Sequence, residues 1–187
     1  MSDDATSNNH PMHIVALSLM LISLRLALPV QTDSNRPEAP TMKVQSNLNQ
    51  LMQGVLYPAA NVVFFSQTDD PATVKRPPGV DPSLATDPLV ATFGGWRAVE
   101  NAALALTESA NLLLIPGRQC SNGVPAPINS PDWTTFVQDL REAGLKAYKA
   151  AQTKDQDKMI EASDTLSQAC AGCHRKWREK PLPNRCK

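Results

Sequence analysis

Two cysteines and a histidine stand together near the C-terminus of this 187-residue chain, in the run Cys170-Ala171-Gly172-Cys173-His174. A Cys-x-x-Cys pair that is followed directly by histidine is typical of covalent attachment of a c-type haem. On a helix, residues three and four apart share one face. The two thiols can therefore reach two vinyl groups on one edge of a porphyrin, and His174 can bind the iron from one side.

The same residues could instead form a thiol redox pair or half of a zinc site. A thioredoxin-like pair lies within a βαβ pattern, and no strand pattern precedes Cys170. A zinc site needs further ligands, but the remaining cysteines are isolated in sequence and the other histidines, His10 and His13, lie near the N-terminus. We therefore predict one covalent haem c, with His174 as an axial iron ligand.

Four stretches of the chain show apolar residues at helical spacing, and no strand pattern separates them. They cover about residues 43–66, 89–115, 131–153 and 154–180. This pattern predicts an all-α fold, an antiparallel four-helix bundle with the haem attached near the C-terminus. The side chains predicted to face the core are Leu48, Leu51, Met52, Val55, Ala59, Val62 and Val63 in the first helix, Phe93, Trp96, Val99, Ala103, Leu106, Ala110 and Leu113 in the second, Trp133, Phe136, Val137, Leu140, Ala143, Ala147 and Ala151 in the third, and Met159, Ala162, Leu166, Ala169, Cys173 and Trp177 in the fourth.

Prolines and glycines mark the limits of these helices. Pro58 lies inside the first helix and predicts a kink or a break, because a proline ring clashes with the carbonyl four residues back, here that of Gly54. Ser130-Pro131 is a typical helix start, and Pro116-Gly117 a typical end. Residues 69–90, rich in Pro, Asp and Gly, predict a long loop.

The N-terminal part of the sequence predicts export. An apolar run of about 15 residues begins at Ile14. It is short for a bilayer span, which takes about 20 residues, and it suits the apolar region of a secretory signal. We therefore divide the chain into a signal-like segment with a polar linker, residues 1–41, and a cytochrome domain, residues 42–187, and we expect a periplasmic protein.

The stretch from Ala162 to Arg178 resembles the C-terminal helix of cytochrome c-prime and the related class II c-type cytochromes. In that family an aromatic residue and an arginine follow the haem-attachment motif, and Trp177 and Arg178 hold these positions here. The resemblance covers roughly residues 43–180 and is strongest in the last helix. It implies a four-helix bundle, a place for Arg178 beside the proximal imidazole, and homodimers formed through the first two helices.

The resemblance also implies that the first helix covers the other side of the haem. Some family members supply a methionine ligand there and transfer electrons, whereas others leave the iron five-coordinate and bind nitric oxide or carbon monoxide. Met52 is the candidate sixth ligand in this chain, and Met42 is a poorer one. If Met52 is not a ligand, it would form an apolar lid with Leu48 and Leu56, with Asn49 as a polar residue among them.

These features predict an exported cytochrome that carries single electrons between redox partner proteins, and the alternative is a haem protein that binds small gases. We do not expect an enzyme, because a peroxidase needs a group that moves protons beside the haem and His174 is the only histidine after residue 13. The 18 Lys and Arg balance the 18 Asp and Glu, which does not favour nucleic-acid binding.

Cys120 and Cys186 predict a disulfide. In an up-down-up-down bundle, the loop after the second helix and the end of the fourth helix lie at the same end, so the two cysteines are close together. A disulfide between them suits an oxidising compartment, and it would close a loop of more than 60 residues.

Overall fold

The computed structural model describes residues 41–179, 185 and 186. These residues belong to one structural unit, Pro40–Lys187. The predicted signal-like segment and its linker lie, apart from Thr41, outside the described residues. Within the described part, no helix is both long enough and apolar enough to cross a membrane.

Helices form the framework of the described chain, as the sequence predicts. The first predicted helix consists of α1 (Leu48–Leu51), a π-helical turn η1 (Met52–Leu56) and α2 (Tyr57–Phe65). The second is α3 (Trp96–Ser109) followed by a 3-10 turn, η3 (Ala110–Leu114). The third is α4 (Pro131–Thr153), and the fourth is α5 (Gln156–His174) with a terminal π-helical turn, η4 (Arg175–Glu179). A single 3-10 turn, η2 (Pro82–Leu84), lies in the predicted long loop of residues 69–90.

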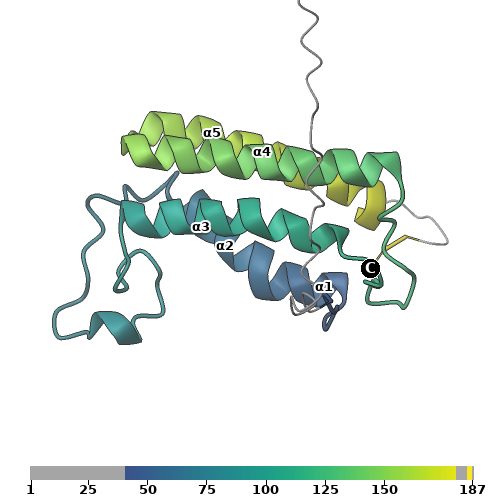
Figure 1. Ribbon diagram of the computed structural model, residues 1–187. Helices are drawn as coiled ribbons and strands as arrows, with labels where there is room; N and C mark the ends of the chain where they lie inside the picture. Colours follow the sequence, from purple (N-terminus) through teal and green to yellow (C-terminus); the bar gives the residue numbers. More distant parts are fainter. Residues whose placement is uncertain (1–40, 180–184, 187) are drawn as a thin grey trace, which may run out of the picture. The chain divides into compact units, whose positions relative to one another are not determined.

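Helices that follow one another along the chain pack together, which is consistent with a four-helix bundle. The element α2 packs on α3, α3 on α4, and α4 on α5. Figure 1 shows α4 and α5 together above α3, with α1 diverging from them toward the end that holds the C-terminus. The bundle is therefore wider at this end.

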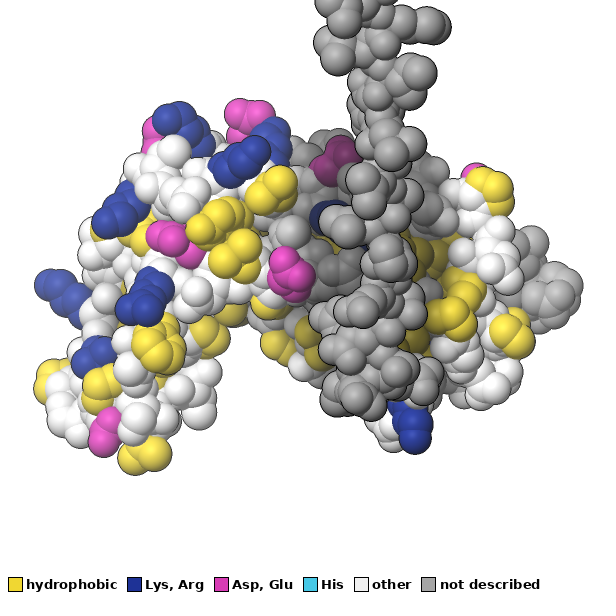
Figure 2. Space-filling model, viewed as in Figure 1, with side chains coloured by type: hydrophobic (Ala, Val, Ile, Leu, Met, Phe, Trp, Pro, Cys, Tyr) yellow, Lys and Arg dark blue, Asp and Glu magenta, His cyan; other side chains and the backbone are white. Residues whose placement is uncertain are grey.

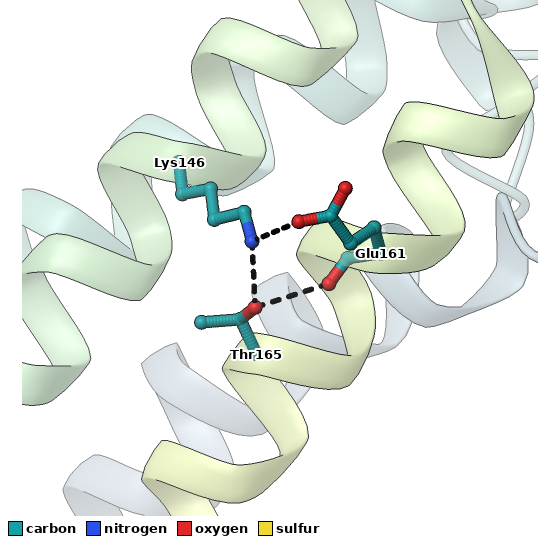
Figure 3. Close-up of polar contacts among 3 residues, drawn as sticks. All are labelled: Lys146, Glu161 and Thr165. Atoms are coloured by element: carbon teal, nitrogen blue, oxygen red, sulfur yellow. Dashed lines mark hydrogen bonds and ion pairs between the residues drawn. The ribbon is translucent and has the colours of Figure 1, made fainter.

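Polar side chains join α4 to α5 at the surface. The Lys146 ammonium on α4 lies 2.6 Å from a carboxylate oxygen of Glu161 and 3.1 Å from the Thr165 hydroxyl, both on α5 (Figure 3). This hydrogen bond and the positive charge lower the pKa of Glu161. Exposed ion pairs contribute little to stability, so the apolar stripe beneath them, which includes the fully buried Met159 and Leu166, holds the two helices together.

Two polar contacts close the bundle between α2 and α5. The Ser163 hydroxyl lies 3.4 Å from the carbonyl oxygen of Val63, and the Gln156 side-chain amide donates to the carbonyl of Ser66 at 3.3 Å. Val63 and Ser163 are completely buried. The two helices therefore meet near the start of α5 and separate toward its end.

A glycine allows α3 and α4 to approach closely. A Cβ atom at Gly144 would lie 2.6 Å from the Thr107 hydroxyl oxygen and 3.2 Å from the carbonyl oxygen of Ala103. Both distances are shorter than ordinary van der Waals contact, so only glycine fits this position without a shift of the backbone.

A capping box sets the start of the first helix. The Asn47 side chain accepts a 2.8 Å hydrogen bond from the Gln50 N–H, and the Gln50 side chain accepts one of 3.0 Å from the Asn47 N–H. This capping box starts the helix at Leu48, a few residues later than predicted. At the start of α4, Ser130 takes the predicted N-cap position, but its side chain makes no capping hydrogen bond.

Of the kink or break predicted at Pro58, the break is not observed, because helical residues continue from Leu48 to Phe65. The helix passes through Pro58 because the preceding turn is π-helical, with the Tyr57 N–H bonded to the carbonyl of Met52. This turn also corrects the predicted core. Val55 is 37% exposed and Leu56 is buried instead.

Phe93 was expected on the buried face of the second helix but is 55% exposed. Gly95 adopts a φ of 61°, and α3 begins only at Trp96. The residues before Gly95 form turns, so the helical spacing that places Phe93 inside does not apply to them. Its ring instead lies at the surface under the guanidinium of Arg97, 4.8 Å from the ring centre.

Candidate functional site

A cavity of about 390 Å³ lies at the wide end of the bundle, between the first helix and the last. Ligand cavities in proteins are commonly about 300–1,000 Å³ in volume and mainly apolar. Most side chains around this one are apolar or aromatic. They are supplied by the first helix (Leu48, Asn49, Met52, Gln53, Leu56, Tyr57, Ala60, Phe64), by α3 and η3 (Leu106, Leu113), by α4 (Trp133, Phe136, Val137, Leu140), by α5 and η4 (Cys170, Cys173, His174, Trp177, Arg178) and by Cys186.

The structure brings together, at this cavity, the α5 residues that the sequence predicts to hold a haem. Cys170, Cys173 and His174 all border it, and the cysteines are free thiols of intermediate burial. The helical part of α5 continues to His174, so the three-residue spacing places both thiols on one face of the helix. The three side chains can therefore act on a single bound group.

Both thiols are poorly suited to redox catalysis. Burial raises the pKa of Cys170, and burial together with the neighbouring Cys170 raises the pKa of Cys173 to about 11. A reactive cysteine pair needs a lowered pKa, because the thiolate is the nucleophile. The raised pKa values of the two thiols therefore argue against thiol exchange as the role of this pair.

His174 and Arg178 lie one turn apart at the end of the last helix. Burial lowers the pKa of His174, and the positive charge of Arg178 lowers it further. Arg178 also borders the cavity and forms an exposed ion pair of 2.9 Å with Glu179. Among the described residues around the cavity, it is the one cationic side chain apart from the titratable His174.

The first helix supplies the wall that faces the last helix across the cavity. Met52 borders the cavity and is partly exposed, and Leu48 and Leu56 on either side of it are buried. Asn49 and Gln53 also border the cavity and bring amide groups to it. Met42 does not contribute, because it is 79% exposed and lies outside the group that lines the cavity.

Aromatic rings from two helices pack beside the thiols. Trp133 and Trp177 meet edge to face, with ring centres 6.0 Å apart. The indole N–H of Trp133 donates to the carbonyl of Leu113 at 3.1 Å. The Trp177 indole nitrogen is buried and, within the described part of the chain, has no hydrogen-bond partner.

The predicted disulfide is present, and it lies at the cavity. Cys120 and Cys186 are bonded, with their Cα atoms 5.0 Å apart. Cys120 is buried, and Cys186 is among the residues around the cavity. The bond consumes two of the four cysteines, so that Cys170 and Cys173 are the free pair.

Arg118 stabilises the chain near the site, although it is not among the residues around the cavity. It is buried, and it donates to the carbonyl of Leu112 at 3.2 Å and to the carbonyl of Ser46 at 2.7 Å. Burial lowers its pKa. Arg118 thereby joins the loop after η3 to the residues that precede α1. An isolated arginine in a loop carries no periodic pattern that could have revealed this role.

The described residues define the class of protein: a four-helix all-α protein with an apolar cavity beside a Cys-x-x-Cys-His run. No protein-family model matches the chain, and no curated protein or solved structure matches it significantly. Within the described residues, no group of three or more His, Cys, Asp or Glu side chains is arranged to hold a metal ion by itself.

Proposed function

We propose that this chain is a c-type cytochrome that holds one haem, attached through Cys170 and Cys173, and carries single electrons between redox partner proteins in the periplasm. One observation carries the proposal: the two free thiols and His174 border a single apolar cavity, while the other two cysteines are bonded to each other. This is the donor set that covalent haem attachment requires.

The surroundings of the cavity fit a haem. The ring of a haem is flat and apolar, and the side chains beside the thiols are aromatic or aliphatic, among them Phe136, Val137 and Trp177. Arg178 brings a positive charge to the cavity, which would favour a group that carries acidic substituents, as a haem does. When bound, haem supplies reversible one-electron chemistry, because its iron is stable in two oxidation states.

The chain's own residues then have distinct roles. Cys170 and Cys173 hold the group in place, and His174 supplies an axial ligand. Met52 is the candidate for the second axial position, since it borders the same cavity from the first helix. The buried apolar side chains on either side of it, Leu48 and Leu56, would limit the access of water to the bound group.

The disulfide supports the proposed location. Disulfides persist in oxidising compartments and are rare in the bacterial cytoplasm. The bond between Cys120 and Cys186 therefore fits a protein that works after export. On the face shown in Figure 2, basic and acidic side chains are interspersed. That face gives no preference for a partner of one charge.

The proposal is tested by producing the protein in a host that attaches c-type haem. Intact mass and a pyridine haemochrome assay should show one covalent haem per chain. The double variant C170A/C173A should lose it, whereas C120S/C186S, which removes the other two thiols, should keep it. A parent protein that carries no covalent haem under these conditions would refute the proposal.

The apolar wall formed by Leu48 and Leu56 favours a second candidate function, the binding of small gases at an open iron position. Absorption spectra with and without carbon monoxide separate the two functions. A six-coordinate low-spin spectrum that carbon monoxide leaves unchanged supports the electron carrier. A five-coordinate spectrum that shifts with carbon monoxide supports the gas-binding protein.

A further inference from the structure

The first helix lines the cavity at a spacing that a regular α-helix cannot maintain. Leu48, Met52, Leu56, Ala60 and Phe64 all border the cavity, at intervals of four residues. Each residue of an α-helix advances by about 100°, so four such intervals turn the last side chain roughly 160° from the first. An unbroken α-helix would direct Phe64 almost opposite to Leu48.

The π-helical turn η1 accounts for the observed spacing. In it the Tyr57 N–H bonds to the carbonyl of Met52, five residues back. A π-bulge accommodates one extra residue within the helix, so the accumulated rotation falls to roughly 60°. Burial confirms the shift: regular spacing predicts Val55 inside, but Leu56 is the buried residue.

Pro58 follows this turn by two residues and is the second residue of α2. A regular helix needs an N–H at position 58 to bond the carbonyl of Gly54, and proline has none. The ring of Pro58 would also collide with that carbonyl. Pro58 is exposed, so its ring contributes little to the core. Its influence acts on the path of the backbone.

We propose that Pro58 is a positioning residue for the cavity. By excluding the α-helical bond to Gly54, it holds the π-bulge over Met52–Leu56, and the bulge keeps Met52 and Leu56 in the cavity wall together with Ala60. The inference rests on the proposed function only for the identity of the group that Met52 faces. The arrangement of the wall can be tested without it.

The first test is the variant Pro58→Ala. Alanine restores the N–H, so residues 52–58 should adopt i to i−4 hydrogen bonds, which NMR contacts between neighbouring residues and amide hydrogen exchange report. In the haem-loaded protein, the absorption bands that report the second axial position should change. The matched control is Pro131→Ala, at the first position of α4, which should leave both readouts as in the parent. A P58A protein that keeps the bulge and the parent spectrum would overturn the inference.

The second test restores the spacing by another route. Deleting Gly54 in the P58A background removes the extra residue, so a regular α-helix can keep both Leu48 and Ala60 in the cavity wall. Gly54 suits this deletion because it is exposed and its Cα faces open space. The spectrum should return toward that of the parent. If the spectrum of the deletion variant stays like that of P58A, Pro58 does not act through the spacing of the residues in the cavity wall. If no variant and not even the parent binds haem, the proposed function fails while the NMR result still decides the role of Pro58.

Discussion

The backbone N–H of Leu48 donates a 2.8 Å hydrogen bond to the carbonyl oxygen of Gln119. Gln119 directly precedes Cys120, whose disulfide partner Cys186 borders the cavity. The first turn of α1 and the disulfide are therefore joined through one residue. The connection that contains Gln119 and Cys120 therefore supports the cavity wall to which Met52 belongs.

Removing this disulfide should lower stability substantially. Its partners are 66 residues apart, and loss of a native disulfide typically costs about 2–5 kcal/mol. We expect C120S/C186S to unfold at a lower denaturant concentration, measured by circular dichroism under otherwise equal conditions. The double variant avoids leaving an unpaired thiol. A change in the free energy of unfolding below about 1 kcal/mol would show that the bond does not constrain the chain as described.

Replacing Met52 should alter the second axial position without disturbing the fold. Met52→Leu keeps an apolar side chain of similar volume, so stability should change by less than about 1.5 kcal/mol. We expect the haem-loaded variant to become five-coordinate and to bind carbon monoxide. Met42→Leu is the matched control, because Met42 is 79% exposed. Identical spectra for the parent and M52L would remove Met52 from the ligand set.

Arg118 should be important for stability although it lies in a loop. Truncation to alanine leaves the carbonyls of Leu112 and Ser46 without this donor. Loss of a hydrogen bond from a charged group costs about 1.5–3 kcal/mol, so we expect R118A to be destabilised by about 2–3 kcal/mol. Chemical denaturation measures the change. The exposed Arg97 provides the comparison, and R97A should stay within about 0.5 kcal/mol of the parent.

The contact between α3 and α4 should not tolerate a side chain at Gly144. Gly144→Ala places a methyl group 2.6 Å from the Thr107 hydroxyl oxygen, and overpacking of this kind typically costs about 1–3 kcal/mol. Thr107→Ala in the same chain removes that oxygen, so the double variant should regain part of the loss in thermal unfolding. If G144A and the double variant were equally stable, the Thr107 hydroxyl would not cause the loss. The helices α3 and α4 would instead move apart to accommodate the methyl group.

The sequence predicted the parts of the fold that follow regular spacing. Every residue expected on the inner face of α4 between Trp133 and Ala151 is buried or partly buried, and the same holds for α5 and η4 from Met159 to Trp177. The predicted proximity of Cys120 and Cys186 is also confirmed. These predictions succeeded because long amphipathic helices bury one face in a regular pattern, which leaves few alternative arrangements.

The remaining differences arise where the backbone departs from regular geometry. Val55 and Phe93 have the right residue type and spacing for the core, but a π-helical turn and a positive φ at Gly95 change the direction in which the chain presents them. Arg118 was missed because it lies in a loop without a periodic pattern and one of its partners, the carbonyl of Ser46, is 72 residues away in sequence. The cavity itself depends on how far α1 diverges from α5, and no local sequence pattern predicts this separation.

The position of Cys186 at the cavity has a consequence for how the protein matures. Four reduced cysteines can pair in more than one way, and Cys186 borders the same cavity as Cys170 and Cys173. Under the proposed function, the chain must oxidise Cys120 and Cys186 while Cys170 and Cys173 stay reduced, because the latter pair would form the thioether bonds. If Cys120 captures Cys186 first, the cavity retains only the two thiols that a haem would use. The loop around Cys120 would then determine which cysteines form the disulfide and which stay free for the haem.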